Sequence, residues 1–185
     1  MGDPGLVASA LPPQATVRSL AMLTDTANGC VVLPPRTGRV RGIVHFLGGA
    51  FVGAAPQLAY PLLLRRLSAA GYTVICVPYK VTFKHLECAA KVKERFEGAV
   101  RELEDSGRGL MVPEGVPIVG LGHSNGSLMH MLGGALYSPG AVDDRRVANA
   151  VMSFNNKQVS DAIPIPGFLN NVKPVADTLE SFGVR

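Results

Sequence analysis

The chain has 185 residues, of which 47% are apolar and 17% are charged. This length suits one domain with a sizeable core, and the low charge content excludes an intrinsically disordered chain. The formal net charge is only +4, and acidic residues interleave with basic ones, so charge does not indicate nucleic-acid binding. No apolar run reaches the roughly 20 residues of a membrane-spanning helix, and we expect neither a transmembrane segment nor a signal peptide. The three cysteines lack CxxC spacing and predict free thiols in a reducing compartment.

The N-terminal part of the chain predicts turns and short strands. Residues 1–15 are rich in proline and glycine and predict an irregular leader, which leaves residues 16–185 as a single domain. Asn28-Gly29 is a turn dipeptide of the kind that joins two antiparallel strands. We expect strands over residues 16–23, 30–33 and 40–47.

From residue 61 onward, predicted helices and strands alternate. Pro61 suits the first position of a helix and Gly71 the position after its last turn, so a helix is expected between them. Apolar runs and helical spacing predict the remaining elements, which are a strand over 73–77, a helix over 84–105, a strand over 116–121, a helix over 125–137 and a strand over 147–154. This alternation predicts an α/β fold with a mostly parallel sheet and helices on both faces.

The segment Gly122-His123-Ser124-Asn125-Gly126 has the Gly-x-Ser-x-Gly pattern of a nucleophile elbow. The pattern alone is weak, but here a predicted strand precedes it and a predicted helix follows it. An elbow holds its serine at positive φ, which crowds the residues two before and two after, so only very small side chains fit there, as Gly122 and Gly126 do. Ser124 is therefore the candidate nucleophile, at a helix N-terminus that favours negative charge.

A second glycine-rich loop, Gly48 to Gly53, follows the strand predicted over 40–47. Such a loop lets the backbone approach a ligand, so an N–H of Gly49 or Ala50 could complete an oxyanion hole with the N–H of Asn125. Phe51 lies in the same loop and is a candidate site-lining residue. The alternative is that these glycines only form a tight turn between a strand and a helix.

A serine nucleophile needs a general base, and the sequence offers no clear one. His130 is the only histidine after Ser124, but it lies inside the helix predicted over 125–137, so we expect it to pack there. Asp161 is the best-placed acid, yet it has no histidine to orient.

The upstream histidines are weaker candidates. His45 lies inside a predicted strand, whereas His85 and His123 could line the site. None of the histidines has the spacing of a metal site, so we predict no metal and no cofactor.

Several segments of the chain resemble one family closely, DUF1350, a group of α/β-hydrolase-like proteins. The resemblance rests on residues 31–35, 43–54, 56–57, 60, 77–79, 82–85, 122–124 and 153–157. The family occurs in cyanobacteria, algae and plants, which implies a chloroplast, or a cyanobacterial cytoplasm, and no secretion. The chain ends at Arg185, about where two further strands would begin in that family, so the resemblance implies a fold truncated on its C-terminal side.

Two functions fit these observations. The chain could be a serine hydrolase that acts on an ester or thioester of a small acyl or lipid-like substrate. It could instead be a catalytically silent subunit that binds a lipid-like ligand or a protein partner covering the sheet edge near Phe154. A nucleotide-binding domain is disfavoured, because neither glycine-rich segment completes the G-x-G-x-x-G or P-loop pattern.

Overall fold

The computed structural model describes residues 25–37, 39–50, 52–82, 84–105, 112–136 and 145–154. These residues form one sheet of six strands in the order β1-β2-β4-β3-β5-β6. The first two strands form a hairpin that joins the sheet antiparallel to β4, and the other four strands run parallel. The strands are β1 (Asp25–Ala27), β2 (Cys30–Leu33), β3 (Gly42–Leu47), β4 (Tyr72–Cys76), β5 (Ile118–His123) and β6 (Arg146–Met152).

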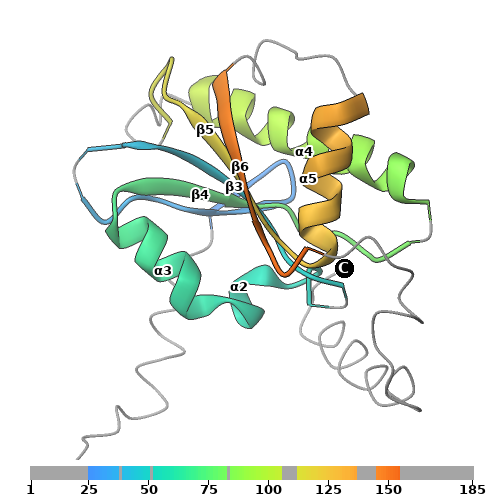
Figure 1. Cartoon of the computed structure of the whole chain (residues 1–185). Coiled ribbons are helices and arrows are strands. Elements are labelled where there is room, and N and C mark those ends of the chain that lie inside the picture. Colours follow the sequence, from blue (N-terminus) through green and yellow to red (C-terminus); the bar gives the residue numbers. More distant parts are fainter. Residues whose placement is uncertain are drawn as a thin grey trace, which may run out of the picture.

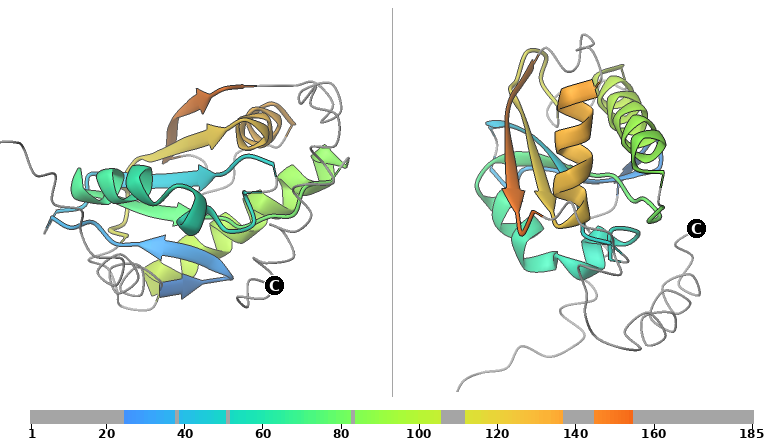
Figure 2. Two further views of the ribbon diagram at one scale, coloured as in Figure 1. Left: turned by 90° about the horizontal axis from the view of Figure 1, so that it is seen from below. Right: turned by 45° about the vertical axis from the view of Figure 1, so that its right-hand side comes forward.

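Helices cover both faces of this sheet (Figures 1 and 2). One face carries α3, and the opposite face carries α4 and α5, which pack against each other. The helices are α2 (Pro56–Ala59), α3 (Pro61–Ala69), α4 (His85–Asp105) and α5 (Asn125–Leu136). The predicted α/β fold, with a mostly parallel sheet between helices, is therefore confirmed.

The core lies in two layers, one on each face of the central strand β3. All six residues of β3 are buried, because strands flank it on both sides and helices cover both of its faces. Val44 and Phe46 face the α3 layer, whereas Ile43 and Leu47 face the α4–α5 layer. Alternate side chains of a strand point to opposite faces, so a strand that is buried on both faces has a continuous run of apolar residues. His45 is the polar exception in this run.

Turn residues fix where the elements end. Asn28 and Gly29 both have positive φ, +48° and +69°, as the two-residue turn of a hairpin requires. Gly71 follows α3 with a φ of +92°, and Pro61 occupies the first turn of that helix, as predicted. The sequence did not indicate β1 or the short helix α2, and β5 lies two residues further along the chain than expected.

Some sequence-based predictions fall outside the described residues. These are the leader at 1–15 and the strand at 16–23. All three cysteines lie within the described part; each is buried and free, and Cys76 is a core residue of β4 as predicted. None of the helices that the structure describes is both long enough and apolar enough to span a bilayer.

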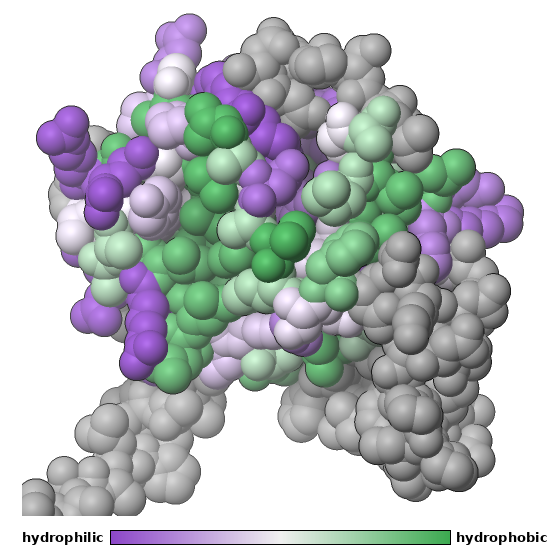
Figure 3. Space-filling model, viewed as in Figure 1, coloured by the Kyte–Doolittle hydropathy of each residue, from purple (hydrophilic) through white to green (hydrophobic). Residues whose placement is uncertain are grey.

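The strand β6 lies at one end of the strand order, and most of its residues are exposed. Val147 is 67% exposed, and Val151 and Phe154 are also exposed. In the view of Figure 3, apolar surface extends across β6 toward α3. Among the described residues, this strand therefore has a neighbour on one side only.

Candidate functional site

Ser124 lies at the turn between β5 and α5, at the carboxyl ends of the parallel strands. Its φ is +52°, in the left-handed region that costs a residue other than glycine about 1–2 kcal/mol. The Ser124 N–H donates a 2.8 Å hydrogen bond to the carbonyl of Met152, and Ser127 Oγ donates at 2.8 Å to the carbonyl of Gly122. These bonds connect the turn to β6 and to the end of β5, and so hold the strained residue in place.

The two glycines of the motif are required by steric contact. A Cβ on Gly122 would lie 2.5 Å from the backbone nitrogen of Ser127. A Cβ on Gly126 would lie 2.6 Å from the carbonyl oxygen of Gly48 and closer still to that of Leu47. Both glycines therefore permit close backbone approach, and Gly126 allows α5 to begin directly against the loop after β3.

That loop is held by two tyrosine hydroxyls. The Gly49 N–H donates to Tyr60 Oη at 2.9 Å, and the same hydroxyl lies 2.9 Å from His123 Nδ1. The Tyr60 oxygen accepts from the peptide N–H, so its own proton can be donated to the imidazole nitrogen. Gly49 and His123 are thereby linked through one side chain next to Ser124.

Tyr79 holds the loop from its other side. Its hydroxyl donates to the Gly48 carbonyl at 2.6 Å and accepts from Asn125 Nδ2 at 3.2 Å. Burial raises the pKa of Tyr79, so the hydroxyl stays protonated and can act as this donor. The side chain of Asn125 thus helps to fix the glycine-rich loop, in addition to the proposed role of its backbone N–H.

The four histidines lie in different places. His85 is the first residue of α4, as expected, and His123 contacts Tyr60. His45 and His130 are 3% and 5% exposed, and they contact each other in the layer between the sheet and α4–α5. His130 Nε2 donates to the His45 carbonyl at 3.1 Å, which confirms its predicted role as a helix-packing residue. None of the four has a hydrogen bond with Ser124 within the described ranges.

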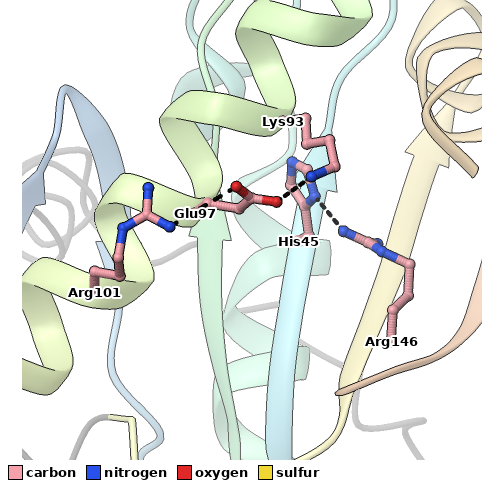
Figure 4. A network of polar contacts seen from close by, with 5 residues as sticks. All are labelled: His45, Lys93, Glu97, Arg101 and Arg146. Atoms are coloured by element: carbon pink, nitrogen blue, oxygen red, sulfur yellow. Dashed lines mark hydrogen bonds and ion pairs between the residues drawn. The ribbon is translucent and has the colours of Figure 1, made fainter. Parts of the chain in front are cut away.

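Polar side chains surround the buried His45 (Figure 4). Its ring stacks on Phe96 at a centroid distance of 3.9 Å, and its Nδ1 lies 3.1 Å from Arg146 Nη2. Burial lowers the pKa of His45 well below its usual value, and it lowers the pKa of His130 to about 3. The positive charge of Arg146 shifts both pKa values in the same direction, so both imidazoles are neutral at pH 7.

This polar cluster explains a glycine in the middle of β5. A Cβ on Gly120 would lie 2.9 Å from His130 Nδ1 and 2.8 Å from Arg146 Nη1. The side chain of Asn149, on the neighbouring strand, comes closer still. Gly120 therefore makes room for polar side chains that come from α5 and β6.

Two residues considered for the site, Phe51 and Asp161, lie outside the described residues. The loop after β3 meets the start of α5 where the carbonyls of Leu47 and Gly48 approach Gly126, next to Ser124 and Asn125 in the chain. Sequence reasoning about the site missed Tyr60 and Tyr79, although both lie in the segments that carry the family resemblance.

A family model described as "Protein of unknown function (DUF1350)" matches residues 25–182, which is most of the chain. The chain belongs to the DUF1350 family. The predicted family is confirmed, and the match includes both tyrosines, the Ser124 turn and all six strands. A mostly parallel sheet with a strand–serine–helix turn makes the fold of this DUF1350 member α/β-hydrolase-like.

Several solved structures are similar to this DUF1350 chain. A carboxyl esterase from Bacillus coagulans has 14% identity and a TM-score of 0.49, over 82% of this chain and 50% of that one. The native esterase Est2 from Thermogutta terrifontis has 15% identity and a TM-score of 0.48, over 73% and 54%. A monoglyceride lipase from Saccharomyces cerevisiae has 18% identity and a TM-score of 0.45, over 82% and 47%. The chain thus spans about half the length of these structures. No curated protein matches it in sequence.

Proposed function

We propose that this protein is a serine hydrolase that acts on an ester or thioester of a small acyl or lipid-like substrate, with Ser124 as the nucleophile. One observation carries the proposal, which is the positive φ of Ser124 between a parallel strand and a helix N-terminus. Backbone strain of this kind persists only where the surrounding contacts enforce it, and it clusters at functional sites. Here the hydrogen bond from the Ser124 N–H to the Met152 carbonyl holds it, and Gly122 and Gly126 leave room for the turn.

The N–H of Asn125 is the first proposed donor to the oxyanion. Asn125 is the first residue of α5, so its N–H has no acceptor inside the helix and lies at the positive end of the helix dipole. The second donor is the N–H of Ala50 or Gly49. In the described structure the Gly49 N–H is bound to Tyr60 Oη, so Gly49 could serve only after that hydroxyl moves.

The histidines that the structure describes do not supply a general base for Ser124. His45 and His130 contact each other, and His123 contacts Tyr60. Without a base, a serine hydrolase keeps only the catalysis that comes from its oxyanion hole and from binding, a loss on the order of 10⁴-fold or more. We therefore expect slow reaction with activated reagents rather than fast turnover by this chain.

Covalent labelling by a fluorophosphonate tests the proposal, because the reagent carries a good leaving group and an oxyanion site should let it react at Ser124 slowly even without a base. We expect labelling of the full chain at Ser124, mapped by mass spectrometry and lost in Ser124→Ala. Ser153 is a matched control, since it is also a serine with positive φ (+49°) and is exposed. Ser153→Ala should label like the unmodified chain, and a chain that does not label at all would refute the proposal.

The exposure of β6 favours a second candidate function, a catalytically silent subunit whose partner covers that strand. Val147 and Val151 leave apolar surface at a sheet edge, and native proteins cover or charge such edges. Size-exclusion chromatography with light scattering would show association, which Val147→Lys should abolish without unfolding the chain. A monomer at all concentrations, with no partner bound, would contradict this second function. The chloroplast location expected from the family resemblance stays a prediction.

A further inference from the structure

One peptide group in the loop after β3 is held at both ends by tyrosine hydroxyls. Tyr79 Oη donates at 2.6 Å to the carbonyl of Gly48, and the N–H of Gly49 donates at 2.9 Å to Tyr60 Oη. This carbonyl and this N–H belong to one planar trans peptide group, so they point in opposite directions. A bond that fixes the direction of the Gly48 carbonyl therefore also fixes the direction of the Gly49 N–H.

Tyr79 packs tightly against this loop. It follows the end of β4 and is only 7% exposed. A Cβ on Gly53 would lie 3.0 Å from Tyr79 Cε1, and the backbone N–H of Tyr79 donates to the Gly53 carbonyl at 3.2 Å. The ring and the backbone of Tyr79 thus both contact the loop, and its hydroxyl cannot turn away from Gly48 without moving them.

The same hydroxyl also reaches the start of α5. It accepts a hydrogen bond at 3.2 Å from Nδ2 of Asn125, whose backbone N–H is the first proposed oxyanion donor. A phenolic hydroxyl has one proton to donate, and because its oxygen accepts from Asn125, that proton is directed to the Gly48 carbonyl. One oxygen atom therefore connects the two segments that carry the proposed donors.

The next peptide group along the loop is held in a different way. The carbonyl of Gly49 accepts a 2.7 Å hydrogen bond from the N–H of Gly53, so this bond fixes the direction of the Ala50 N–H. Removal of the Tyr79 hydroxyl should therefore release the Gly49 N–H and leave the Ala50 N–H in place. The two candidates for the second oxyanion donor can be separated by this difference.

We propose that Tyr79 is a positioning residue whose hydroxyl orients the Gly49 N–H as the second oxyanion donor. The proposal rests on the proposed hydrolase function. Gly49 lies close to the reaction centre, since a Cβ on it would be 3.0 Å from Nδ1 of His123, the residue before Ser124. Tyr60 Oη accepts the Gly49 N–H in the described structure, and a substrate oxygen would take its place.

Labelling kinetics of Tyr79→Phe over a range of fluorophosphonate concentrations test this role. We expect the maximal rate to fall about 10- to 100-fold while the concentration for half-maximal rate stays the same, because an oxyanion donor acts in the transition state. A merely structural role would lower the fraction of chains that label, and not the rate at which folded chains label.

Tyr72→Phe is the matched control for these kinetics. Tyr72 lies at the opposite end of β4, where Arg41 lies over its ring, so this variant should label like the unmodified chain. An unchanged maximal rate in Tyr79→Phe would leave Ala50 as the second donor and overturn the proposal. An equal loss in Tyr72→Phe would also overturn it.

Hydrogen exchange of the Gly49 amide, followed by NMR, tests the same role without any labelling. Tyr79→Phe should speed this exchange about tenfold, because a peptide group that turns loses its bond to Tyr60. The amide of Ser124, which is bound to the carbonyl of Met152, should exchange as before. Unchanged exchange at Gly49, or equal acceleration of both amides, would overturn the positioning role. A failure of the unmodified chain to label would refute the hydrolase function, whereas the exchange rates would still show whether Tyr79 holds the peptide group.

Discussion

Replacement of Gly126 by alanine tests whether the start of α5 must lie directly against the loop after β3. The added Cβ would be 2.6 Å from the Gly48 carbonyl oxygen and closer still to that of Leu47. Both atoms belong to the backbone, so the contact can be relieved only if α5 and the loop move apart. Overpacking of this kind costs about 1–3 kcal/mol and occasionally more, and contacts this short belong at the upper end.

The same helix contains a matched control. A Cβ on Gly133 would meet nothing within 4 Å. Gly133→Ala should therefore show only the helix-propensity gain of alanine over glycine, about 0.8–1 kcal/mol. Gly126 is also in α5 and has a similar gain, so we expect a net destabilisation of about 2 kcal/mol for Gly126→Ala. The two substitutions should thus differ by about 3 kcal/mol and have opposite signs.

Urea unfolding followed by circular dichroism measures both free energies. For a chain of this size, about 2 kcal/mol also corresponds to a melting temperature lowered by about 4–8 °C. Gly126→Ala should in addition label more slowly with the fluorophosphonate, because the two proposed oxyanion donors would separate. If Gly126→Ala were as stable as Gly133→Ala, the close approach of helix and loop would not exist in solution, and the proposed oxyanion site would lose its basis.

Three further predictions concern strain, pH and the tyrosine next to the loop. Ser124→Gly should raise the free energy of unfolding by about 1 kcal/mol, because glycine adopts positive φ without the penalty. A lower free energy of unfolding in chemical denaturation would show that Ser124 is not strained. His45 and His130 have lowered pKa values when folded, so the unfolded chain binds more protons than the folded chain below about pH 6.5. The free energy of unfolding should therefore keep its full value above that pH and decrease as the pH drops toward about 3, by up to about 1.4 kcal/mol per pH unit for each histidine. His130→Met should make the urea midpoint depend less steeply on pH. Tyr60→Phe should lower stability by about 0.5–1.5 kcal/mol but speed fluorophosphonate labelling, because it frees the Gly49 N–H; slower labelling would mean that the hydroxyl supports the site.

The order of strands and helices could be predicted from the sequence because each signal is local. The turn at Asn28-Gly29 and the stop at Gly71 depend on the conformations open to those residues, whatever surrounds them. Apolar runs mark buried strands in the same way. The strand β1 has no such signal, since its three residues become a strand only by pairing with β2. The short helix α2 was missed because four residues are too few for a helical pattern.

The sequence by itself also indicated the backbone setting of Ser124, because the Gly-x-Ser-x-Gly pattern and the crowding at Gly122 belong to one short segment, whereas the crowding at Gly126 comes from the loop after β3. The contacts that decide how the site is built join residues far apart in the chain. Tyr60 reaches His123 across 63 positions, and Arg146 reaches His45 across 101. No pattern of local propensity encodes such pairs, since they exist only after the strands have taken their places in the sheet. The tertiary structure therefore decided that the Gly49 N–H is bound to Tyr60, and that two of the histidines lie in the core and do not reach Ser124.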